Sequence, residues 1–76
     1  MENNFRTKDL YLSAFLCAKG LTLEQVEREN NICWFVFGND QRIKKLIKEY
    51  WSGTSLCNAK DYADAIRTLK DRIFNE

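Results

Sequence analysis

The pattern of apolar and polar positions divides the chain into five predicted elements. Apolar residues recur every three or four positions in three segments, which is typical of helices, and two shorter segments have the alternation or the β-branched and aromatic content of strands. The predicted elements are a helix over residues 8–19, strands over 21–28 and 32–37, and helices over 41–51 and about 59–74. The order α-β-β-α-α predicts an α+β fold, with three helices and a two-stranded antiparallel hairpin.

The first predicted helix is apolar on nearly every side. Thr7 is expected to cap its start and Gly20 to end it. Leu12 and Leu16 fall on a different face from Phe15. Such a helix lies at the centre of a fold or contacts a partner.

The two predicted strands are joined by Asn30 and Asn31, and asparagine tolerates the positive φ angles of a tight hairpin turn. In the first strand the alternation slips between Leu23 and Val26, which indicates a bulge or a bend. The second strand, residues 32–37, is apolar on both faces. Its two faces are therefore expected to be covered by helices, or one of them by a partner.

The last two predicted helices are amphipathic. Asn39 or Asp40 is expected to cap the first of them, and Asn58 the second. Residues 1–6 are expected to form a short polar tail, and residues 7–76 a single domain. The predicted core draws on every helix and on the second strand: Phe15, Trp34, Phe35, Ile43, Ile47, Tyr62, Ile66 and Leu69.

The composition is that of a folded protein, and its net charge is too small to create a long-range electrostatic field that would attract a partner. Of 76 residues, 45% are hydrophobic and 13% aromatic, which argues against disorder. The formal net charge is +1, so binding to nucleic acid or to anionic lipid needs a local patch. The first eight residues are polar and the longest apolar run, residues 10–18, is too short to cross a bilayer, so we expect a cytoplasmic protein without a membrane segment.

The residues that carry catalysis or bind metals are scarce. The chain has no histidine and no glycine-rich phosphate loop. Its cysteines, Cys17, Cys33 and Cys57, are too widely spaced for a zinc motif, and we expect them to be reduced and mostly buried. The sequence therefore predicts a protein that is not an enzyme, with no cofactor and no metal.

The second predicted helix carries the candidate nucleic-acid-binding residues, Arg42, Lys44, Lys45 and Lys48. A cationic cluster of this kind can contact phosphates. Carboxylates lie four residues from Lys44 and from Lys45, and we expect them to neutralise the cluster in part, which favours a merely solvated lysine-rich face over a phosphate site.

Excess apolar surface on the first helix and second strand suggests instead a protein interface. Its candidate residues are Leu12, Leu16, Trp34, Phe35 and Phe37. The same excess predicts a symmetric homodimer, formed through the first helix or through the edge of the hairpin.

Three stretches carry a resemblance to a known family: FRTKDLYLSAF at residues 5–15, CWFVF at 33–37 and YADAIRTLK at 62–70. The chain resembles a small family of uncharacterised bacterial and bacteriophage proteins, described as a domain of unknown function. The resemblance implies a phage or mobile-element setting and a freestanding domain. It implies no activity, ligand or site residue.

Three functions remain open. The leading hypothesis is a small binding protein that acts on a protein partner, as an inhibitor or accessory factor. One alternative is a nucleic-acid-binding accessory protein that uses the lysines of residues 41–51, with Tyr50 and Trp51 nearby. Another is a sponge or sensor for a small nucleotide, with an aromatic pocket edged by Arg6 or Arg28. Salt distinguishes the first two, because binding driven by phosphate contacts weakens steeply as salt rises.

Overall fold

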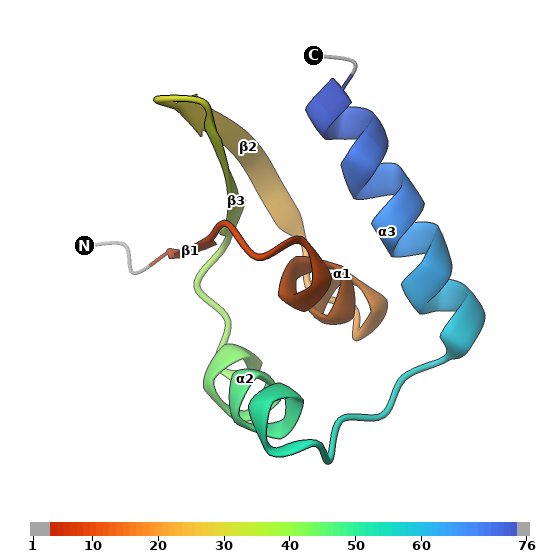
Figure 1. Ribbon diagram of the computed structural model, residues 1–76. Coiled ribbons are helices and arrows are strands. Elements are labelled where there is room, and N and C mark those ends of the chain that lie inside the picture. The colour runs from red at the N-terminus through yellow and green to blue at the C-terminus, as the bar shows by residue number, and fades with distance from the viewer. Residues whose placement is uncertain (1–3, 75–76) are drawn as a thin grey trace.

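The computed structural model describes residues 4–74, which form three strands and three helices. The strands make one antiparallel sheet, and the helices gather on one side of it (Figure 1). This confirms the α+β class. In chain order the elements are β1 (Phe5–Thr7), α1 (Leu10–Ala18), β2 (Leu23–Glu29), β3 (Ile32–Phe37), α2 (Arg42–Ser52) and α3 (Ala59–Phe74).

The strand order is β1-β3-β2, so β3 lies in the centre of the sheet. The prediction of two strands is wrong. Residues 5 and 6, assigned to a tail, belong to a third strand with Thr7, and this strand pairs with β3. Three residues are too few for alternation to reveal a strand, and β1 exists because β3 offers it an edge. Residues 1–3 of the expected tail lie outside the described residues.

The hairpin of β2 and β3 confirms the predicted turn and bulge. Asn30 and Asn31 have φ angles of 52° and 69°, as a two-residue hairpin loop requires. The pairing shifts between Leu23 and Gln25, so that Glu24 is the additional residue of the bulge. The bulge keeps Leu23 and Val26 on the same face of the sheet, opposite Phe37 and Phe35.

The two faces of the sheet differ in what lies next to the apolar residues of β3. Phe35 and Phe37 point toward the helices and are almost completely buried. On the outer face, Arg6 pairs with Val36, and residues 27 and 29 of β2, both glutamates, pair with residues 34 and 32. Polar residues of the two neighbouring strands therefore flank the apolar residues of β3 on this face, and no helix is needed to cover it.

The first helix is the centre of the helical layer and contacts both α2 and α3. It starts at Leu10 rather than at Lys8, and its cap is Asp9 rather than the predicted Thr7. The Asp9 carboxylate accepts hydrogen bonds from the amides of Tyr11 and Leu12, each at 3.0 Å. Thr7 cannot act as the cap because it is paired with β3.

The core lies between α1 and the inner face of the sheet, with α2 and α3 at its two sides (Figure 1). Half of the predicted core is confirmed as buried: Phe15, Phe35, Ile43 and Leu69. The other half is only partly buried: Trp34, Ile47, Tyr62 and Ile66. Leu12 and Leu16 are also buried, because α1 is enclosed by the sheet and by both other helices.

We expect Leu69→Ala to lower the free energy of unfolding by about 2–5 kcal/mol, because Leu69 is the one fully buried residue of α3 within the described chain, at 2% exposure, and its loss leaves a cavity. Ile66→Ala should cost less, since Ile66 is only partly buried. The matched control is Leu56→Ala, at a side chain 79% exposed, which should change stability by less than about 0.5 kcal/mol. Urea unfolding of the three variants measures this order, and equal midpoints for Leu69→Ala and Leu56→Ala would contradict the packing of α3.

Candidate nucleic-acid interface

The inner face of α2 is fixed by the core. Ile43 and Leu46 are buried, and Ile47 and Tyr50 are partly buried and pack against the core. With 3.6 residues per turn, this arrangement directs the remaining positions of α2 to solvent. The helix ends at Gly53, whose φ of 80° is the left-handed conformation that favours glycine.

The outer face of α2 carries three exposed lysines, Lys44, Lys45 and Lys48. In the part of the chain from residue 4 to residue 74, no ion pair involves any of them. Asp40 and Glu49, the carboxylates expected to neutralise the cluster in part, form no close ion pair with these lysines in the described chain: Asp40 pairs with Arg42, and Glu49 forms no ion pair there. The lysines are therefore available to a phosphate, whereas Arg42 is already engaged.

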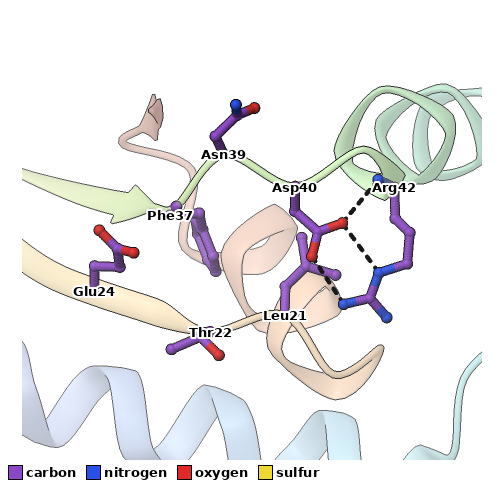
Figure 2. Close-up of a pocket in the computed structure, with 8 residues that line it drawn as sticks. Leu21, Thr22, Glu24, Phe37, Asn39, Asp40 and Arg42 are labelled. Atoms are coloured by element: carbon purple, nitrogen blue, oxygen red, sulfur yellow. Dashed lines mark hydrogen bonds and ion pairs between the residues drawn. The ribbon is translucent and has the colours of Figure 1, made fainter. Parts of the chain in front are cut away.

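Asp40 and Arg42 form the tightest polar arrangement near this surface (Figure 2). Asp40 Oδ1 accepts hydrogen bonds from the Arg42 amide at 2.8 Å and from Arg42 Nε at 3.1 Å, and Asp40 Oδ2 accepts from Arg42 Nη2 at 2.9 Å. The hydrogen bonds to Arg42 lower the pKa of Asp40 to about 2, and those to Asp40 raise the pKa of Arg42. Gln41 occupies the cap position of α2, but its side chain makes no capping hydrogen bond. The Asp40 carboxylate accepts the bond from the Arg42 amide instead, and the pair thereby anchors the start of the helix.

The pair borders a cavity of about 180 Å³ between the start of β2 and the loop that precedes α2 (Figure 2). Glu24 lies on one side of the cavity, with Asp40 and Arg42 on the other. The volume is below the range of about 300–1,000 Å³ that small-molecule sites occupy, and the charges of the pair are already satisfied by each other. The cavity therefore does not qualify as the functional site.

Further cations border the lysine face of α2. A shallow hollow between the end of α1 and α2 is lined by Lys19, Arg42, Lys45, Leu46 and Glu49. Lys19 Nζ donates a hydrogen bond to the carbonyl of Leu56 at 2.8 Å. On the lysine face and its border, five cationic side chains accompany two carboxylates, those of Asp40 and Glu49. The region is thus locally basic on a chain whose formal net charge is +1.

Trp51 lies at the last turn of this helix and is 66% exposed. The helix period places Trp51 at the border of the apolar face of α2, and in the structure it lies outside the core. Its ring contacts Tyr50 edge to face, with 5.0 Å between the centroids, and Tyr50 packs on Phe15 with 5.6 Å between the centroids. Burial raises the pKa of Tyr50, which agrees with its position between the core and Trp51.

The residues predicted for a protein interface do not form a surface. Leu12, Leu16, Phe35 and Phe37 lie in the core, and Trp34 alone of the five is partly exposed. The apolar excess is covered within one chain, because α1 and β3 are both central elements. The homodimer remains a prediction. Of the two interfaces predicted for it, the one through Leu12 and Leu16 is buried, and the hairpin keeps a free edge at β2 within the described chain.

The arginines considered for a nucleotide pocket are also engaged. The Arg6 guanidinium lies over the Trp34 ring, 4.7 Å from its centroid, and forms ion pairs of 3.1 Å with Glu27 and 3.4 Å with Glu29. Arg28 donates a hydrogen bond to a backbone carbonyl of α3. Neither arginine borders one of the cavities described above.

The cysteines are free, with Cys17 and Cys33 partly buried and Cys57 exposed, contrary to the expectation for Cys57. Burial raises the pKa of the Cys17 thiol, although the positive charge of Arg72 opposes the shift. In the described part of the chain, no three cysteine or carboxylate side chains gather to hold a metal ion. No helix of that part is long and apolar enough to cross a bilayer.

The family follows from comparison with known proteins. A family model described as a domain of unknown function, DUF5659, matches residues 2–75. The chain belongs to this family. No curated protein and no solved structure matches it. Membership of this family implies no activity.

We expect Asp40→Asn to weaken the fold at neutral pH, because asparagine still offers an oxygen to the Arg42 amide but loses the charge that holds the guanidinium. The pKa of Asp40 is about 2 in the folded chain and about 3.9 for an unperturbed aspartate, so its stabilising effect is complete above about pH 4 and is lost as the pH falls toward 2. The difference in urea midpoint between the native chain and Asp40→Asn should therefore shrink over that range. Asp71→Asn, at an exposed carboxylate, is the control, and a difference for Asp40→Asn that is constant with pH would contradict the ion pair.

Proposed function

We propose that this protein is a non-enzymatic accessory protein that binds nucleic acid through phosphate contacts made by Lys44, Lys45 and Lys48. The observation that carries the proposal is the outer face of α2, where three exposed lysines have no ion pair in the chain from residue 4 to residue 74. Lysine side chains presented together on one rigid helix are the usual electrostatic means of contacting a phosphate backbone. The setting implied by the family resemblance, a bacterium or a bacteriophage, belongs to the same proposal.

A protein partner is a weaker candidate than the sequence suggested. That hypothesis depended on apolar surface left uncovered on residues 8–19 and 32–37. Four of its five residues are buried, so they offer nothing to a partner. On the remaining outer face of the sheet, Arg6 forms ion pairs with Glu27 and Glu29, so these charged side chains are already engaged with one another.

The strength of binding follows from the number of lysines. Non-specific binding that depends on phosphate contacts has dissociation constants of about 10⁻⁴ to 10⁻⁶ M at physiological salt. Three contacts place this protein at the weak end of that range. The logarithm of the binding constant should fall with the logarithm of salt concentration with a slope of about −2 to −3.

The test is a fluorescence anisotropy titration of a labelled oligonucleotide, repeated between about 50 mM and about 200 mM salt. The substitution of Lys44, Lys45 and Lys48 by glutamine should abolish measurable binding or bring the salt slope close to zero. The fold should be unaffected, because all three side chains are exposed, and circular dichroism checks this.

The matched control changes the net charge equally but on α3, by the substitution of Lys60, Arg67 and Lys70 by glutamine. These side chains are exposed, and their helix α3 lies on the other side of α1 from α2 (Figure 1). Binding should be largely retained. If the control loses binding as fully as the α2 variant, the protein responds to net charge alone, and α2 is not the site.

A further inference from the structure

Trp51 is the exposed side chain of α2 that phosphate binding alone does not explain. An indole is one of the largest apolar groups in a protein, and two-thirds exposure forgoes most of the stabilisation that its burial would give. Tyr50 holds it edge to face at 5.0 Å, and Tyr50 is itself packed on Phe15, which is buried. The ring is therefore supported from the core and presented to solvent.

Trp51 also lies in line with the lysines. Lys44, Lys48 and Trp51 are spaced by four and three residues, which places them in one row along the outer face of the helix. At a rise of about 1.5 Å per residue, the row extends about 10 Å from Lys44 to Trp51. A ligand that follows this row meets two cations and then an aromatic ring.

The side chains of the row, two lysines and a tryptophan, favour single-stranded over double-stranded nucleic acid. Bases of a duplex are stacked on one another and offer no free face to an indole, whereas bases of a single strand can stack on an aromatic side chain. The row contains no asparagine, glutamine or arginine that could pair with the edges of a base. Recognition of this kind is therefore expected to be indifferent to sequence.

We propose that the α2 face binds single-stranded nucleic acid, with the backbone along Lys44 and Lys48 and a base stacked on Trp51. This inference rests on the proposed function, since it requires that the lysines contact phosphates. It adds that Trp51 makes the protein selective for single strands. Its failure can be separated from failure of the phosphate site, because different substitutions remove the two contributions.

The test compares a single-stranded oligonucleotide of about 15 nucleotides with the duplex of the same sequence, at one salt concentration near 50 mM. The native chain should bind the single strand about tenfold more tightly, or better. Trp51→Ala should weaken single-strand binding by about 5- to 100-fold and leave duplex binding unchanged, since stacking on one aromatic ring contributes to that extent. Trp51→Phe, which keeps a smaller aromatic ring, should restore part of the loss.

The matched control is Phe74→Ala. Phe74 is 78% exposed and, like Trp51, lies at the last turn of a helix, but on α3. Its removal should not change either affinity. A second readout uses Trp34→Phe, in which Trp51 is the one remaining indole, and the fluorescence of this variant should be quenched by the single strand and not by the duplex.

Three results would overturn the inference. If Trp51→Ala binds the single strand as the native chain does while the α2 lysine variant does not, phosphate binding stands and stacking is refuted. If polyglutamate competes as well as the single strand and Trp51→Ala makes no difference, the face binds an acidic polypeptide by charge. If neither form of nucleic acid binds near 50 mM salt, the phosphate site and the stacking site both fall.

Discussion

The structure depends on the placement of one strand that is apolar on both faces. β3 must bury Phe35 and Phe37 on one face and shield Trp34 and Val36 from solvent on the other. The centre of the sheet is the position that satisfies both requirements. There, α1 covers the inner face, while side chains of β1 and β2 flank the outer face, with Arg6 laid over the Trp34 ring. The short strand β1 is a consequence of this constraint. It pairs with the edge of β3 that β2 leaves free, and its Arg6 side chain covers the Trp34 ring on the outer face.

The same arrangement determines which surface is available for binding. The sequence favours α1 as the helix that contacts a partner. Most of α1 is buried in the core, so it leaves little exposed surface for a partner. α2 packs through Ile43 and Leu46 at the side of α1, and nothing in the described chain lies over its opposite face. The packing of the first half of the chain therefore selects the lysines and Trp51 of the second half as the available surface. A helix held by two buried residues and by the Asp40–Arg42 pair at its start is a rigid support for such a surface.

The sequence predicts those parts of the fold that depend on local patterns and misses those that depend on neighbours. The hairpin turn at Asn30 and Asn31, the bulge after Leu23, the cap at Asn58 and the lysine face of α2 all follow from residues close together in the chain. β1 could not be found in this way, since three residues have no periodicity and the strand is stabilised by a partner thirty positions away. The cover of Leu12 and Leu16 was missed for the same reason, because an apolar helix shows that it needs neighbours but not that its own chain supplies them. Trp51 was ambiguous because the helix period places it at the border of the apolar face, and only the absence of a neighbouring element there leaves it exposed.

A net charge of +1 is compatible with a phosphate-binding face because several carboxylates lie away from α2 and some of them are engaged in ion pairs there. Glu27 and Glu29 share Arg6 on the outer face of the sheet, and Asp64 lies between Lys60 and Arg67 on α3. Opposite charges a few ångströms apart largely cancel at a distance, and salt screens what remains beyond about 8–10 Å. A phosphate that approaches α2 therefore experiences the lysines much more strongly than the acidic residues of the sheet or of α3. The total charge of the chain predicts the absence of long-range steering. The affinity of a surface depends instead on the charges close to it, and on the described face of α2 three lysines without an ion pair accompany one such carboxylate, Glu49.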